Sequence, residues 1–146
     1  MKMAEISKVL VEGDQALLKQ FAEEVEANHQ ITIIKHPGRS LVMAKTRDSV
    51  SRAPFYIGEV LVSECTVSID QVYGLGVVMG DEPEKSYHLA VVDAALLAKL
   101  PVTEQWMERL VGAKAALDEK RRWQHAQAAK TNVDFATVEE FGDDKR

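Results

Sequence analysis

The fold is decided by residues 54–100, PFYIGEVLVSECTVSIDQVYGLGVVMGDEPEKSYHLAVVDAALLAKL. β-Branched and aromatic residues dominate its first part and predict strands over Phe55 to Ser63 and Cys65 to Ile69, with a third over Tyr73 to Met79. The run Gly80-Asp81-Glu82-Pro83-Glu84 then predicts a helix start. This order indicates a β-meander that leads directly into a helix.

The start of that helix has the pattern of a capping box. Asp81 precedes Glu84 by three residues, and Pro83 stands where a missing N–H costs nothing. Apolar residues then recur at three- and four-residue spacing and predict one buried face; they are Tyr87, Ala90, Val91, Ala94, Leu97 and Ala98. Asp93 and His88 lie beside this face. We interpret both as polar groups satisfied by a neighbouring element, with a site role as the alternative.

Gly74, Gly76 and Gly80 form G-x-G-x-x-x-G ahead of the helix, a pattern that invites comparison with phosphate-binding loops. The spacing matches neither the dinucleotide fingerprint nor the Walker loop, and Asp81 competes for the helix N-terminus. We therefore favour glycines that relieve a strand bulge or permit close approach by another chain.

The flanking sequence supplies further elements. Met3 to Val11 predicts a helix, and Asp14 is expected to cap a second one. Gln30 to His36 and Leu41 to Arg47 predict strands joined by a turn at Pro37 to Ser40. The fold class is therefore α+β, an antiparallel sheet of four or five strands with helices packed on one side.

A long helix is expected after Pro101, capped by Thr103, and a C-terminal arm follows it. Trp123 lies among cations near the end of this helix, on a face that is either solvated or in contact with a partner. Val133, Phe135 and Val138 alternate with polar residues, which suggests an arm that docks on another subunit. We divide the chain into a single α+β domain over 1–130 and this arm over 131–146.

Composition excludes several function classes. The 146 residues carry a net charge of -5 and no basic strip, which argues against nucleic-acid binding. Cys65 is the sole cysteine and the four histidines show no metal spacing, so no metal site is expected. No apolar run suits a membrane span or a signal peptide, and a cytoplasmic protein is expected.

Several motifs together resemble a known family. They are F-Y-x-G-E at Phe55, Tyr56, Gly58 and Glu59, the three glycines, D-A-A-L from Asp93, and T-N-V-D-F-A-T from Thr131. In this order and spacing the chain resembles the G-subunit family of the bacterial carbon–phosphorus lyase system, over roughly residues 14–138. The family-motif positions are Phe55, Gly58, Glu59, Gly74, Gly76, Gly80 and Asp93.

The chain departs from the family pattern at two places. Asp81 replaces a basic residue that some members carry after the third glycine. Residues 47–53 replace a glycine-rich loop, and they leave Arg47 and Arg52 as a basic pair that the family pattern does not explain.

The resemblance implies a subunit of a multi-subunit ribose 1-methylphosphonate 5-triphosphate synthase. In that family the G subunit assembles with the H, I and J subunits as an obligate hetero-oligomer. The G, H, I and L subunits together support the reaction of ATP with an alkylphosphonate, which gives α-D-ribose 1-alkylphosphonate 5-triphosphate and adenine. The resemblance places an iron–sulfur cluster and S-adenosylmethionine on the J subunit, and ATP with Mg²⁺ in the complex, with no cofactor on this chain alone.

The residues themselves show no nucleophile beside a base, so we expect no catalytic residue on this chain. The candidate substrate contacts are Arg47 and Arg52, for phosphonate or triphosphate charge, and Glu59, as a hydrogen-bond acceptor. The candidate docking residues are Trp123, Val133, Phe135 and Val138. Two alternatives stay open: a free-standing phosphate- or nucleotide-binding protein that uses Gly74 to Gly80, and a purely structural adaptor.

Overall fold

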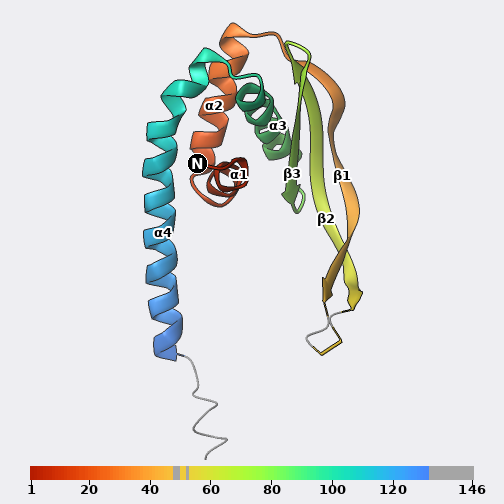
Figure 1. Cartoon of the computed structure of the whole chain (residues 1–146), viewed down its shortest axis with the longest axis vertical. Helices are drawn as coiled ribbons and strands as arrows, with labels where there is room; N and C mark the ends of the chain where they lie inside the picture. The colour runs from red at the N-terminus through yellow and green to blue at the C-terminus, as the bar shows by residue number, and fades with distance from the viewer. Residues whose placement is uncertain (48–49, 52, 132–146) are drawn as a thin grey trace, which may run out of the picture.

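The computed structural model describes residues 1–47, 50–51 and 53–131 and has an α+β fold. Its elements, in chain order, are α1 (Met3–Glu12), α2 (Gln15–Asn28), β1 (Thr32–Arg47), β2 (Pro54–Ile69), β3 (Val72–Met79), α3 (Pro83–Leu97), the 3-10 helix η1 (Pro101–Gln105) and α4 (Trp106–Thr131). The strands form an antiparallel sheet in the order β1-β2-β3. The helices lie to one side of this sheet, as predicted (Figure 1).

The expectation of four or five strands is wrong for the described residues, where the sheet has three. The predicted turn at Pro37 to Ser40 does not form. Instead β1 runs through it, and the ladder absorbs the irregular backbone in register shifts between Ile33 and Lys35 and between Lys35 and Gly38. A proline is tolerated there because β1 is an edge strand. The two strands predicted on either side of Glu64 likewise form one continuous strand, β2.

The contact between α3 and β3 forms the centre of the fold. Gly74 and Gly76 are buried and turn toward α3. A Cβ added to Gly74 would overlap the backbone of Ala90 and Ala94, and one added to Gly76 would overlap the backbone of Ser86 and Ala90. The two glycines therefore let helix backbone lie directly on strand backbone. The predicted close approach is made by the chain's own helix and not by another chain.

α3 is covered from more than one side, so its buried surface is wider than the single predicted face. The buried residues are Ser86, Leu89, Ala90, Val91, Val92, Ala94 and Ala95, whereas Leu97 is exposed. β3 covers one side of the helix and α2 packs against another. A helix between two layers buries residues all round, which a one-face pattern does not predict.

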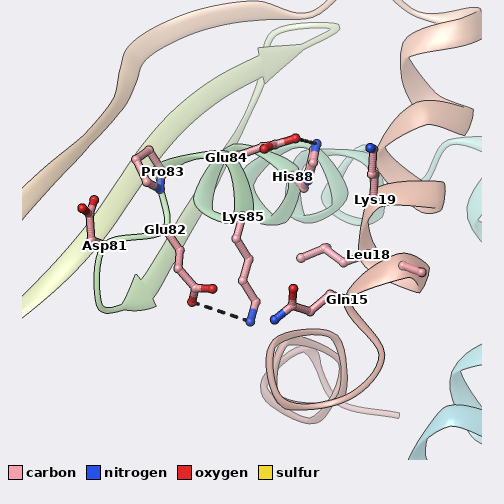
Figure 2. Close-up of a pocket in the computed structure, with 10 residues that line it drawn as sticks. Gln15, Leu18, Lys19, Asp81, Glu82, Pro83, Glu84, Lys85 and His88 are labelled. Carbon is pink, nitrogen blue, oxygen red and sulfur yellow. Dashed lines mark ion pairs between the residues drawn. The ribbon is translucent and has the colours of Figure 1, made fainter.

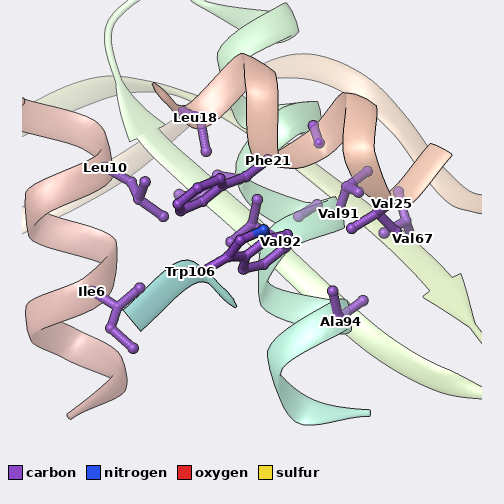
Figure 3. Close-up of a cluster of buried hydrophobic side chains, with 14 of the residues drawn as sticks. Ile6, Leu10, Leu18, Phe21, Val25, Val67, Val91, Val92, Ala94 and Trp106 are labelled. Carbon is purple, nitrogen blue, oxygen red and sulfur yellow. The ribbon is translucent and has the colours of Figure 1, made fainter. Parts of the chain in front are cut away.

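α2 and α4 are joined by an aromatic pair. Phe21 stacks on Trp106 with a centroid separation of 4.4 Å, and both side chains are fully buried (Figure 3). The indole N–H of Trp106 donates to Glu24 at 2.7 Å, and Arg109 donates to the same carboxylate at 2.7 Å. The Arg109 guanidinium also lies 4.6 Å from the centre of the Phe21 ring. A buried indole needs such an acceptor, so Glu24 fixes how α4 starts.

The helix starts confirm one predicted cap and correct two others. Asp14 accepts the Ala16 N–H at 2.9 Å, as predicted. Asp81 is not the cap of α3: the N-cap is Glu82, and no side chain caps this helix. The prediction that Thr103 caps the long helix is also wrong. Its hydroxyl donates to the carbonyl of Leu100, just before η1, and α4 begins only at Trp106.

Ser63 of β2 holds the backbone on both sides of Asp81. Its fully buried hydroxyl accepts the Glu82 N–H and donates to the Gly80 carbonyl, both at 2.8 Å. An N-cap carboxylate accepts from the second or third residue beyond it, and for Asp81 the second is Pro83, which has no N–H. The Ser63 contacts instead hold the backbone on both sides of Asp81. Asp81 instead lies exposed, 3.6 Å from the Arg39 guanidinium.

α4 continues to Thr131, beyond the proposed domain limit at residue 130. Val133, Phe135 and Val138 lie outside the described residues, so the C-terminal arm stays a prediction.

The α3–β3 contact predicts opposite effects for two glycine substitutions. Gly76→Ala should lower the free energy of unfolding by about 3 kcal/mol or more, because the added methyl group meets backbone atoms that can move only with the whole helix. Gly112→Ala should raise it by about 0.5–1 kcal/mol, because Gly112 lies in α4 with open space around its Cα. Urea denaturation of both variants measures the difference. Equal stability of the Gly76→Ala variant and the natural chain would contradict the packing described here.

Candidate functional site

The most prominent surface feature is a two-stranded ribbon, formed by residues 41–47 of β1 and 54–61 of β2, that extends past β3 and α3 (Figure 1). Its exposed large apolar side chains are Leu41, Val42, Met43, Phe55, Tyr56, Ile57 and Leu61. Tyr56, for example, exposes 64% of its surface. An isolated two-stranded ribbon is only marginally stable in water. Contiguous exposed apolar surface of this kind is typical of an interaction site.

Both faces of the ribbon are apolar. Leu41 is paired with Leu61, and the next pair along the ladder is Val42 with Val60. Directly paired residues share a face and successive pairs alternate between faces, so apolar residues lie on each side. A ribbon that rested on one flat surface would have one apolar and one polar face. The pattern therefore fits a partner that encloses the ribbon.

The family motif F-Y-x-G-E lies within this ribbon. Gly58 is paired with Ala44, where the β1–β2 register shifts, and has a φ of 148°. A side chain is strained at this φ, so the position favours glycine. Phe55 and Tyr56 lie between this irregularity and the end of the ribbon. Glu59 lies on its other side, nearer the rest of the sheet. The motif thus builds the bulge and the exposed aromatic residues of the ribbon.

A second exposed apolar row lies on β3, on the face of the sheet turned away from α3. Its members are Tyr73, Leu75, Val77 and Met79, which alternate with buried Gly74, Gly76 and Val78. None of the helices described covers this row, because they lie on the other side of the sheet (Figure 1).

The predicted substrate contacts are not gathered at one point in the described part of the chain. Glu59 is exposed and pairs with Met43, and Arg47 pairs with Pro54 at the ribbon end. Along β2 the two pairs are five positions apart, which in extended strand is a span of about 16 Å. The Arg47 side chain and the whole of Arg52 lie outside the described structure. These three contacts therefore stay predictions.

An open cavity of about 490 Å³ lies between the N-terminal ends of α2 and α3 (Figure 2). Its charged lining consists of Lys19, Lys85 and His88 with Asp81, Glu82 and Glu84. Lys85 is already engaged: its ammonium donates to the Val11 carbonyl at 2.8 Å and lies 3.8 Å from Glu82. Three carboxylates and a committed lysine make a poor trap for a phosphate group.

The phosphate-loop alternative for Gly74 to Gly80 loses its structural basis. Gly74 and Gly76 face the backbone of α3, and their N–H groups belong to a sheet strand. Only Gly80 lies at the strand-to-helix junction, where its φ of 91° allows the chain to turn. The motif therefore serves packing and turning.

Asp93 of α3 has the structural role that the sequence predicted. Its carboxylate accepts the Leu75 N–H of β3 at 3.0 Å, so a neighbouring element satisfies it. Burial raises the pKa of the Asp93 carboxyl, and the Leu75 hydrogen bond offsets part of that rise. The contact also occupies a backbone donor on the outer edge of the sheet.

The described ranges hold no cluster of three His, Cys, Asp or Glu residues that could bind a metal ion. Cys65 is buried in the core, and this burial raises the pKa of its thiol. A thiol in this state is a packing residue and not a nucleophile. His88 lies 4.0 Å from Glu84, and its largely buried side chain lines the cavity between α2 and α3.

Comparison with known families agrees with the motifs of the ribbon. A model of the family described as phosphonate metabolism protein PhnG matches residues 3–139, nearly the whole chain. The chain belongs to the PhnG family. A search of curated proteins gave no match. Membership of this family implies a role in phosphonate metabolism.

Two further observations concern partners and location. Trp123 is 64% exposed on α4, and its docking role stays a prediction, as do those of Val133, Phe135 and Val138 outside the described residues. None of the helices in the described ranges combines the length and apolar character needed to cross a bilayer.

Sequence reasoning missed Ser63 and the ribbon as a unit. Nothing local marks Ser63, because its partners lie 17 and 19 residues away. A signal for the ribbon was present: residues 54–62 are apolar at both odd and even positions, whereas a strand with one solvated face alternates. Such a run was compatible with burial inside this chain, and only the structure shows that it is exposed.

The raised pKa of Asp93 predicts a pH-dependent stability difference. The folded chain keeps this proton at pH values where the unfolded chain has released it, so the natural chain loses stability as pH rises through the folded pKa. Asp93→Asn keeps an acceptor for Leu75 without the charge. The free energy of unfolding of the natural chain minus that of the variant should therefore fall with rising pH.

Urea titrations at several pH values between roughly 3 and 7 measure this difference. Asp93→Ala, which also removes the acceptor, serves as the comparison and should be less stable than Asp93→Asn throughout. A difference between the natural chain and Asp93→Asn that is flat or rises with pH would contradict the assignment.

Proposed function

We propose that this PhnG family chain is a non-catalytic subunit of the carbon–phosphorus lyase core complex and assembles with the H, I and J subunits. With the H, I and L subunits it supports the reaction of ATP with an alkylphosphonate, which gives α-D-ribose 1-alkylphosphonate 5-triphosphate and adenine. The observation that carries this proposal is the ribbon, which bears the family motif and is apolar and exposed on both faces.

The energetics of the ribbon favour an obligate hetero-oligomer. Each large apolar side chain that becomes fully buried contributes about 1.5–3 kcal/mol before ordering costs are subtracted. Seven such side chains are exposed on the ribbon. In the isolated chain much of this apolar surface faces water, whereas in a complex it can hold the subunits together. The second exposed row, on β3, extends the surface available to partners.

In the proposed reaction a phosphonate oxygen forms a bond to the anomeric carbon of the ribose, and the bond from that carbon to the adenine nitrogen breaks. Adenine leaves with the bonding electron pair and takes up a proton. Water competes with phosphonate for the same carbon, so the site must exclude it. We assign the chemistry to the I subunit, and to this chain the task of enclosing that site. ATP with Mg²⁺, and the later iron–sulfur and S-adenosylmethionine chemistry, belong to other subunits of this cytoplasmic complex.

A free-standing nucleotide-binding role has one observation in its favour, the cavity of about 490 Å³ beside α3. Its carboxylate-rich lining and the engaged Lys85 make it a weaker basis than the ribbon. A purely structural adaptor shares the ribbon and differs only in its effect on the reaction. Adenine release by the assembled complex, measured with and without this chain, separates that alternative.

The ribbon predicts a separation of stability from assembly. Leu41→Ser combined with Tyr56→Ser should weaken association with the H, I and J subunits by about tenfold or more, because two exposed apolar anchors are lost. The melting temperature of the isolated chain should change little, since both side chains are exposed there. Adenine release should fall in proportion to the chain lost from the complex.

Val111→Ser is the matched control, because Val111 is an exposed apolar residue of α4 away from the ribbon. Co-purification with the H, I and J subunits should be unchanged for this variant. If the ribbon variant assembles like the natural chain, the ribbon is not the docking device and the proposal fails.

A further inference from the structure

We propose that the outer edge of β1 at residues 41–45 receives an extended, acidic strand from a partner subunit, which adds a fourth strand to the sheet. This inference rests on the proposed function and specifies how the ribbon is bound. It concerns the backbone of the edge, in addition to the side chains on the two faces.

The hydrogen-bond directions of the sheet show which β1 groups point outward. The Gly80 N–H donates to the Leu61 carbonyl at 2.8 Å, so Leu61 turns its backbone polar groups toward β3. Directions alternate along a strand, so Val60 and Val62 turn theirs toward β1. Their partners Val42 and Ser40 then face β2. Leu41 lies between these two residues and Met43 follows Val42, so both turn their backbone N–H and C=O groups away from β2, toward the open edge of the sheet.

The two edges of the sheet differ in how they are protected. On β3, the outward Leu75 N–H is occupied by Asp93. On the near half of β1, Pro37 and two register shifts interrupt a regular edge. The stretch from Gly38 to Ala44 pairs without a shift, and no hydrogen bond from the described residues reaches the outward N–H of Leu41 or Met43. Natural edge strands are normally blunted, so a regular and apolar edge is suited to strand addition.

The charge of β1 defines the chemistry of the added strand. β1 carries Lys35, Arg39, Lys45 and Arg47 and no carboxylate. Lys35 is paired with Glu64, and Arg39 lies near Asp81. Lys45, beside the open edge, has no ion pair among the described residues. A strand with acidic residues complements this edge, and its apolar residues would extend the two apolar faces of the ribbon.

The experiment measures binding of the full-length chain to the co-expressed H, I and J subunits. Met43→Pro removes the outward N–H and the side chain, whereas Met43→Ala removes only the side chain. Proline is tolerated at an edge position whose N–H points away from the sheet. We expect Met43→Pro to weaken binding at least about tenfold more than Met43→Ala, since the loss of one edge hydrogen bond also disrupts its neighbours.

A charge variant gives a second test that leaves the backbone unchanged. Lys45→Glu should weaken binding by about five- to tenfold and make the remaining binding less sensitive to salt. Lys99→Glu is its control, because Lys99 is exposed at the C-terminal end of α3, away from the edge, and should bind like the natural chain. Melting temperatures of the isolated variants identify any that fail to fold. If Met43→Pro fails to fold, the comparison of Lys45→Glu with Lys99→Glu tests the inference.

The outcomes separate this inference from the proposed function. If the natural chain does not bind the H, I and J subunits, the proposed function fails. If it binds but Met43→Pro and Met43→Ala are equally affected, only side chains matter and strand addition is overturned. The inference is also overturned if Lys45→Glu binds like Lys99→Glu.

Discussion

The direct contact between the backbones of α3 and β3 is the constraint on which the rest of the structure depends. Gly74 and Gly76 make it possible, because neither leaves a side chain between helix and strand. With α3 held this close, Asp93 reaches the Leu75 N–H at the sheet edge. Ser63 in turn organises the junction into α3 through Gly80 and Glu82. α1 and α2 pack on α3, α4 packs on α1 and α2, and these described helices leave the opposite face of the sheet uncovered.

This constraint changes the meaning of the glycine motif. Read from sequence, three glycines before a helix suggest backbone donors free to hold an anion. In the fold, two of them are covered by α3, and the Ser63 hydroxyl accepts the N–H of Glu82, the residue that precedes the helix. The surface that we propose for docking lies elsewhere, on a ribbon whose bulge at Gly58 and aromatic residues come from the other family motif. Packing and the proposed docking thus depend on different motifs of the same 47-residue stretch.

The parts of the fold that could be predicted from sequence are those set by local chemistry. Asp14 caps α2 because the acceptor and donor are two residues apart, and the apolar spacing of α3 marks a real helix. The failures involve distant partners: Ser63 holds the strand-to-helix junction around Asp81, and edge position lets β1 continue through Pro37.

In the candidate site too, local features could be predicted from sequence and features set by distant elements could not. Sequence motifs located the ribbon residues Phe55, Gly58 and Glu59, but not their exposure, which depends on where the helices end. Arg47 and Glu59 were grouped by charge and motif, and the ladder places them about 16 Å apart along β2. The role of Asp93 was predicted because a polar residue beside a buried helical face needs a partner, although the partner itself, Leu75, was not.

Hydrogen–deuterium exchange of the full-length chain, alone and in complex with the H, I and J subunits, tests the central claim most directly. The account predicts that residues 41–46 and 54–61 exchange readily in the isolated chain and become strongly protected in the complex. Exchange near the cavity, at residues 81–88, should change far less. Protection of the cavity region with an unchanged ribbon would contradict the claim that this chain works by inserting its ribbon into a partner.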